Sequence, residues 1–167
     1  ADPTVGALLA NTDRIIAMAE VMAAEQCTIA AFSEQVVGGY PAEDLVQWRS
    51  FVARQWEELK RFAKATATHQ EGDHPTVFVV GLVVEFGGHL YNTAALVCDG
   101  SIIGVVPKEK LPTYGVFYER RTFSAGAPGM TAEVNGVPFG DLIFRFPFGT
   151  MAVEVCEDLW SPDGPLK

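Results

Sequence analysis

Three residues that could together break an amide bond each stand at the end of an apolar, strand-like run: Glu34, Lys108 and Cys156. Open α/β sheets bind ligands at the ends of their strands. We therefore expect a packed sheet to bring the three side chains together, through direct contacts or bridges of one water. Cys156 lies in the stretch Thr150-Met151-Ala152-Val153-Glu154-Val155-Cys156-Glu157-Asp158-Leu159-Trp160.

These three side chains have complementary roles in the hydrolysis of a carboxamide or nitrile. Glu34 would accept the thiol proton of Cys156 as general base, and the thiolate would attack the substrate carbon. Lys108, as an ammonium, and the backbone N–H of Glu157 would stabilise the oxyanion. Glu34 would then protonate the departing ammonia and activate a water molecule against the thioester.

Each residue also has a simpler interpretation. Most free cysteines are small buried hydrophobic residues, so Cys156 could belong to a core strand. Glu34 could be a solvated loop carboxylate, and Lys108 could belong to a solvated surface turn with Glu109 and Lys110. The catalytic interpretation therefore requires the three side chains to meet.

The composition limits the class of protein. The 167 residues are 49% hydrophobic and 20% charged, which is typical of a soluble globular domain. The formal charge of −9 argues against a nucleic-acid partner or an anionic membrane, since both bind basic patches. No apolar run approaches the roughly 20 residues that span a bilayer.

The three cysteines are scattered and form no metal-binding pattern. We interpret them as free thiols and expect a cytoplasmic protein without a signal peptide. His69, Asp73 and His74 share a polar loop, which we interpret as solvated surface, and we expect no metal.

Hydrophobic periodicity predicts an α/β fold. Apolar residues at helical spacing predict helices over 11–25, with an N-cap at Asn11 or Thr12, and over 43–66. Asp99-Gly100 and Asn135-Gly136 are typical hairpin turns. Apolar or alternating runs predict one sheet built from strands at 27–32, 76–85, 91–98, 101–107, 142–147 and 151–156.

The order of these motifs resembles that of the carbon–nitrogen hydrolase, or nitrilase, superfamily. The motifs are Phe32-Ser33-Glu34, Lys108-x-x-Leu111 and Glu154-Val155-Cys156-Glu157-Asp158. A finer resemblance is to the glutamine-hydrolysing domain of the glutamine-dependent NAD synthetases. It rests on Asp2-Pro3-Thr4-Val5-Gly6, Gly39-Tyr40-Pro41-Ala42-Glu43-Asp44-Leu45, Leu90-Tyr91-Asn92-Thr93-Ala94, Lys108-x-x-Leu111-Pro112-x-Tyr114-x-x-Phe117-x-Glu119 and Cys156-Glu157-Asp158-Leu159-Trp160.

The resemblance implies an αββα four-layer sandwich, incomplete in this chain, and assigns the catalytic set as Glu34, Lys108 and Cys156. It also implies that Glu119 supports the lysine. The residues Tyr114, Phe117 and Glu157 match positions that line the glutamine pocket. One departure is Ser33, which stands where the family usually has proline.

The resemblance further implies that ammonia released from glutamine travels to a synthetase domain of the same polypeptide, which amidates deamido-NAD. That step uses ATP and Mg²⁺, whereas the glutaminase step needs no cofactor. The synthetase's Ser-Gly-Gly-x-Asp-Ser loop is not in the sequence. We therefore expect residues 1–167 to be a hydrolase-domain fragment, the N-terminal portion of a longer homo-oligomeric protein, without the synthetase domain.

Two other functions stay open at this point. One is a stand-alone amidase or carbamoylase of the same superfamily, which substrate profiling separates from a glutaminase. The other is a non-catalytic fragment or interaction module that keeps the scaffold without a complete pocket.

Overall fold

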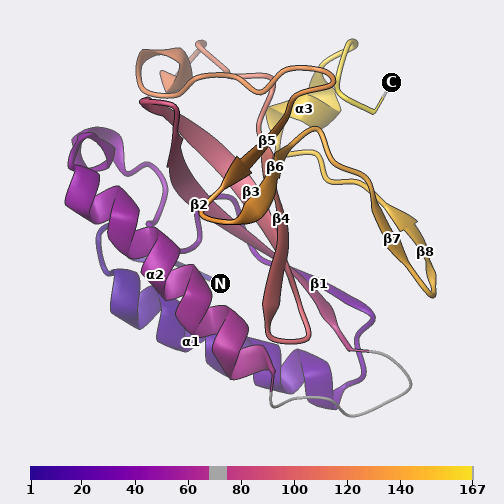
Figure 1. Cartoon of the computed structure of the whole chain (residues 1–167). Helices are drawn as coiled ribbons and strands as arrows, with labels where there is room; N and C mark the ends of the chain where they lie inside the picture. Colours follow the sequence, from indigo (N-terminus) through magenta and orange to yellow (C-terminus); the bar gives the residue numbers. More distant parts are fainter. Residues whose placement is uncertain (68–74, 167) are drawn as a thin grey trace.

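A six-stranded mixed sheet forms the centre of the chain, with strand order β1-β2-β3-β4-β6-β5 (Figure 1). The computed structural model describes residues 1–67 and 75–166. The strands of this sheet are β1 (Ile29–Ala31), β2 (Val77–Phe86), β3 (His89–Cys98), β4 (Ser101–Pro107), β5 (Thr131–Val134) and β6 (Val137–Gly140). A second, two-stranded sheet contains β7 (Phe144–Phe146) and β8 (Gly149–Met151).

Two long helices lie on one face of the large sheet (Figure 1). They are α1 (Leu8–Ala24) and α2 (Arg49–Thr66), which contact each other, and α2 also packs on β2, β3 and β4. The remaining helical segments are short: η1 (Glu43–Gln47), η2 (Glu119–Arg121) and α3 (Glu157–Trp160). No helix within residues 1–67 and 75–166 is long and apolar enough to cross a bilayer.

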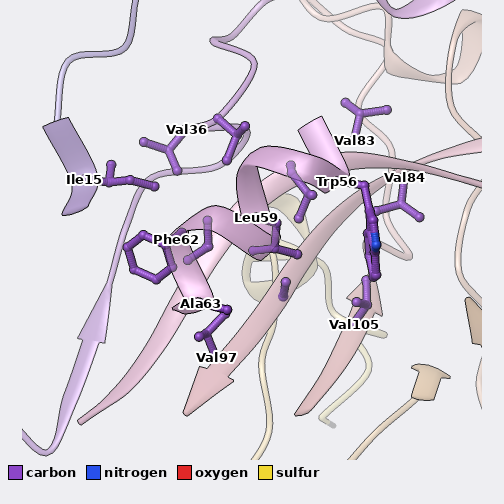
Figure 2. Close-up of a cluster of buried hydrophobic side chains, with 14 of the residues drawn as sticks. Ile15, Val36, Trp56, Leu59, Phe62, Ala63, Val83, Val84, Val97 and Val105 are labelled. Atoms are coloured by element: carbon purple, nitrogen blue, oxygen red, sulfur yellow. The ribbon is translucent and has the colours of Figure 1, made fainter. Parts of the chain in front are cut away.

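The main core lies between α2 and the sheet (Figure 2). The apolar stripe of α2 buries Trp56, Leu59 and Phe62 against the strands. The ring of Phe62 meets Phe78 of β2 edge-on, with ring centroids 5.5 Å apart. Burying such a side chain stabilises the fold by about 1.5–3 kcal/mol, so this stripe holds α2 on the sheet.

Both predicted helices are present, with different starts. The predicted N-cap at Asn11 or Thr12 is wrong, because α1 begins at Leu8. The Asn11 side chain instead donates to the carbonyls of Thr4 and Val37 and ties the helix to two loops. The predicted 43–66 helix is divided at Trp48, whose extended backbone separates η1 from α2.

The predicted strands at 76–85, 91–98 and 101–107 are confirmed by β2, β3 and β4. The β3–β4 turn has Asp99 and Gly100 at φ of 48° and 72°, the left-handed conformation that a tight hairpin turn needs. The Asn135-Gly136 hairpin is confirmed by β5 and β6. The predicted 27–32 strand is shorter, since β1 covers only Ile29–Ala31, parallel to β2.

The prediction that 142–147 and 151–156 join the same sheet is wrong. The predicted strand at 142–147 is shorter in the structure, where it is β7, and it pairs with β8 in the separate hairpin. Residues 152–155 are not a strand. The N–H of Val155 donates to the Asp158 side chain at 3.0 Å, so this backbone group is satisfied by a local carboxylate in place of a neighbouring strand.

The second face of the large sheet is covered by this same region. Val77, Val79 and Leu96 point away from the helices and pack with Phe144 and Val155 in a second apolar cluster. The layers therefore run helix, sheet, β hairpin, which is the α–β–β order of an αββα sandwich. The expected mixed α/β architecture is confirmed, as a partial sandwich in this chain.

Candidate active site

Glu34 lies in the loop that follows β1, and the sheet holds that loop closely. A Cβ atom at Gly81 of β2 would stand 2.4 Å from the Gln35 nitrogen and 2.6 Å from the Ser33 carbonyl oxygen. The glycine therefore lets the loop pack directly on β2. Asn92 of β3 then donates to Glu34 Oε1 at 2.6 Å and fixes the carboxylate.

Lys108 directly follows β4, and its side chain is completely buried between two carboxylates. Its Nζ lies 2.7 Å from Glu34 Oε1 and 3.0 Å from the Glu119 carboxylate. Burial alone would lower the pKa of Lys108, but the hydrogen bonds and charges of Glu34 and Glu119 outweigh it and raise the pKa. Lys108 is therefore a fixed ammonium at neutral pH.

Cys156 stands immediately before α3 and is exposed. Its φ of 50° places a non-glycine residue in the left-handed region, and such backbone strain is concentrated at functional sites. The Glu34 carboxylate lies within hydrogen-bonding reach of the Cys156 thiol and raises the thiol's pKa. The predicted strand at 151–156 does not deliver this thiol; a turn directly before α3 presents Cys156.

The pKa of the Cys156 thiol is raised above its ordinary value. Partial burial of the sulfur, in a residue that is exposed as a whole, is the largest cause; the charge of Glu34 adds to it, and the ammonium of Lys108 opposes it. A raised pKa keeps the thiol protonated at neutral pH. A nucleophile in this state needs a base that removes its proton during attack, and the Glu34 carboxylate is in contact with it.

Glu119 is buried, and its carboxylate lies 3.0 Å from the Lys108 ammonium. Its carboxylate also accepts a hydrogen bond of 3.2 Å from the Tyr40 hydroxyl. Burial raises the pKa of Glu119, while the charge of Lys108 opposes the shift. The expected contact between Glu119 and the lysine is therefore confirmed.

Tyr114, Phe117 and Glu157, the predicted pocket residues, form one group. The Tyr114 hydroxyl donates to Glu157 Oε2 at 2.7 Å, and its ring meets Phe117 with centroids 5.7 Å apart. Glu157 is the residue after Cys156 and begins α3. The group is therefore joined to the Cys156 turn through Glu157, while its role in binding stays a prediction.

The structure brings Glu34, Lys108 and Cys156 together, which confirms the predicted convergence. Their catalytic roles stay predictions. No role of Asn92 or Tyr40 was predicted from the sequence. One feature of the sequence could have indicated Asn92. It is an amide within an apolar strand, and a buried polar side chain needs a hydrogen-bond partner.

No group of three or more histidine, cysteine, aspartate or glutamate side chains within residues 1–67 and 75–166 is arranged to hold a metal ion. The loop with His69, Asp73 and His74 lies outside the described residues. The candidate site thus consists of a thiol, two carboxylates and an ammonium.

Alkylation by iodoacetamide is expected to be faster at Cys156 than at Cys27 or Cys98, because Cys156 is exposed and the other two are half-buried. Since the pKa of Cys156 is raised, its labelling rate should continue to increase with pH beyond the ordinary cysteine range of about 8.5. Peptide mass spectrometry after timed labelling measures both effects. Equal rates for the three thiols would count against a nucleophilic role.

Comparison with known proteins identifies the family. The carbon-nitrogen hydrolase family model matches residues 2–167. A glutamine-dependent NAD(+) synthetase from Xylella fastidiosa is 37% identical over 162 residues, which are 95% of this chain and 26% of that protein. The one from Mycobacterium tuberculosis is 34% identical over 169 residues, covering 97% of this chain and 24% of that protein.

A solved structure of a similar protein has the same fold. The glutamine-dependent NAD(+) synthetase from Cytophaga hutchinsonii matches with a TM-score of 0.84 and 25% identity, over 93% of this chain and 26% of that chain. The chain thus spans about a quarter of the length of these relatives. Because the family model matches nearly the whole sequence, the chain belongs to the carbon-nitrogen hydrolase family.

Proposed function

We propose that this chain hydrolyses the side-chain amide of glutamine through a thioester on Cys156 and releases ammonia. One observation carries the proposal: the Glu34 carboxylate lies 2.7 Å from the Lys108 ammonium and within hydrogen-bonding reach of the Cys156 thiol. A base in contact with a protonated nucleophile and a fixed cation is the arrangement that acyl transfer requires.

Acylation begins when Glu34 removes the thiol proton of Cys156. Asn92 and Lys108 both hold Oε1 of Glu34, so we assign the proton transfer to Oε2. The sulfur forms a bond to the amide carbon, and the carbonyl oxygen becomes an oxyanion. The Lys108 ammonium and the backbone N–H of Glu157 stabilise that oxyanion.

The tetrahedral intermediate then collapses and the C–N bond breaks. Glu34 returns its proton to the leaving nitrogen, which departs as ammonia. A water molecule enters, Glu34 removes its proton, and the resulting hydroxide attacks the thioester carbon. The C–S bond breaks, the thiol of Cys156 regains a proton, and glutamate leaves.

The group beside the thiol supports glutamine as the substrate. Glu157 offers a carboxylate, which suits the α-ammonium group of a free amino acid. Tyr114 holds that carboxylate and, with Phe117, gives an aromatic wall for the substrate's methylene groups. A simple aliphatic amide carries no ammonium group and so cannot form the ion pair with Glu157.

The names of the relatives support a proposal for the whole protein. In a longer polypeptide, ammonia from this site is passed to a synthetase domain that amidates deamido-NAD with ATP and Mg²⁺. The glutaminase step itself uses no cofactor. We further propose a homo-oligomer. The chain covers about a quarter of the relatives' length, so the synthetase step belongs to other parts of such a protein.

Substrate profiling of the full-length protein that carries these residues tests the proposed function. Ammonia release should be at least about tenfold faster, as kcat/KM, from glutamine than from propionamide or butyramide, because the short amides lack the group that Glu157 binds. Faster release from the short amides would favour a stand-alone amidase. No release from any amide would favour a non-catalytic module.

A further inference from the structure

Asp158 is a buried carboxylate that no step of the proposed reaction uses. Only 2% of it is exposed. Its Oδ1 accepts the N–H groups of Glu109, at 3.1 Å, and Lys110, at 2.7 Å. Its Oδ2 accepts the N–H of Val155 at 3.0 Å. One side chain therefore joins two segments that are far apart in the sequence.

The three amides flank the reacting groups. Glu109 and Lys110 directly follow Lys108, and Val155 directly precedes Cys156. The Lys108 backbone is held on its other side by β3, since its N–H donates to the Asn92 carbonyl at 2.9 Å. The turn that carries Cys156 closes on itself, because the N–H of Leu159 donates to the Cys156 carbonyl at 3.1 Å. Asp158 links the Lys108 segment to the Cys156 turn.

We propose that Asp158 is a positioning residue that sets the placement of the Lys108 ammonium relative to the Cys156 thiol. The inference rests on the proposed function. Hydrogen bonds to an ionised acceptor are about twice as strong as neutral ones, and three of them fix both segments. A misplacement of about 1 Å at a reacting centre can lower a rate about 10²-fold. The contribution of Asp158 is therefore geometric.

A second tie between the same segments provides the control. Lys110 Nζ pairs with Asp163 at 2.9 Å, but Asp163 is 81% exposed. Exposed ion pairs contribute little, typically about 0–1 kcal/mol. Asp163→Asn therefore removes a carboxylate from the same region without removing the buried link.

Asp158→Asn tests the proposal in the full-length protein, because asparagine keeps the shape but offers one acceptor oxygen where the fold uses two. Its NH₂ group would face an N–H donor. We expect kcat for glutamine hydrolysis to fall about 10- to 100-fold, with KM nearly unchanged. Asp163→Asn should keep the wild-type kcat.

The pH profile of Cys156 alkylation by iodoacetamide is a second measurement, which needs no substrate. Glu34, Lys108 and Glu119 act on the thiol, and only Lys108 lowers its pKa. Displacing Lys108 should shift the alkylation profile of Asp158→Asn to higher pH. Simple loss of a nearby negative charge would shift it to lower pH, so the direction separates positioning from direct electrostatics.

The outcomes decide between the alternatives. A lower kcat together with an upward shift supports positioning. An unchanged profile, or a kcat within about twofold of the wild type for folded Asp158→Asn, overturns it. If the wild type hydrolyses no glutamine but the profile still shifts, the proposed function fails and the positioning role stands.

If circular dichroism shows that Asp158→Asn does not fold, Asp158→Glu replaces it. Glutamate keeps the charge but displaces both oxygens, so the same expectations apply.

Discussion

Cys156→Ala in the full-length protein is expected to abolish glutamine-dependent NAD formation and to spare the reaction driven by free ammonia. Glutamine serves only as a source of ammonia at this site. The thiol forms the covalent intermediate, and alanine leaves no nucleophile in its place. Ammonia supplied in solution bypasses that step and reaches the synthetase site directly. Parallel assays with saturating glutamine and with ammonium chloride measure the two reactions.

Cys98→Ala is the matched control, because Cys98 is a half-buried thiol at the end of β3. It should keep both activities. If Cys156→Ala lost the ammonia reaction together with the glutamine reaction, Cys156 would have a structural role. If glutamine-dependent synthesis survived in Cys156→Ala, the assignment of this chain as the glutaminase would be wrong.

Lys108→Ala is expected to lower kcat for glutamine hydrolysis about 10²-fold or more, through the loss of oxyanion stabilisation worth a few kcal/mol. The structure adds a second consequence. Without the ammonium, Glu34 and Glu119 become close carboxylates with no cation between them, and breaking a buried pair costs about 3–5 kcal/mol. We therefore expect a lower melting temperature as well, measured by calorimetry.

Lys110→Ala is the matched control for this variant. Lys110 lies two residues further along the chain, and its ammonium pairs with the exposed Asp163. Removing that pair should change both kcat and stability little. A large loss in Lys110→Ala combined with a small loss in Lys108→Ala would reverse the assignment of the catalytic lysine.

The ends of the predicted strands located Glu34 and Lys108 correctly. Glu34 follows β1 and Lys108 follows β4, and these two strands run in the same direction in the sheet, so the residues after them share one edge. The hairpin turns were also predictable. Asp99-Gly100 and Asn135-Gly136 both adopt the left-handed backbone that few other residue pairs accept.

The backbone before Cys156 was not predictable from its own residues. Residues 152–155 have a strand-like composition, but a strand also needs a partner with which to form hydrogen bonds. The side chain of Asp158, three residues further along, satisfies the Val155 N–H instead, and an apolar run does not show that its backbone is paired locally. The start of α1 was missed because Asn11, a favoured N-cap residue, binds loop carbonyls from inside the helix.

The protonation of the thiol was also beyond the sequence. Lys108 lowers the pKa of Cys156 and Glu34 raises it, so the residue types alone give no net direction. Burial decides the balance and raises the pKa. The folded geometry therefore indicates a thiol that stays protonated until the base removes its proton.

The central claim is that Cys156 carries the acyl group of glutamine during turnover, and rapid-quench mass spectrometry tests it most directly. The wild-type full-length protein is mixed with glutamine, and the reaction is quenched with acid within the first turnovers. The masses of its peptides are then measured. The account predicts a glutamyl group on the peptide that contains Cys156, in step with the first burst of ammonia, and none in Cys156→Ala. A burst of ammonia with Cys156 unmodified, or with the glutamyl group on another residue, would contradict the account.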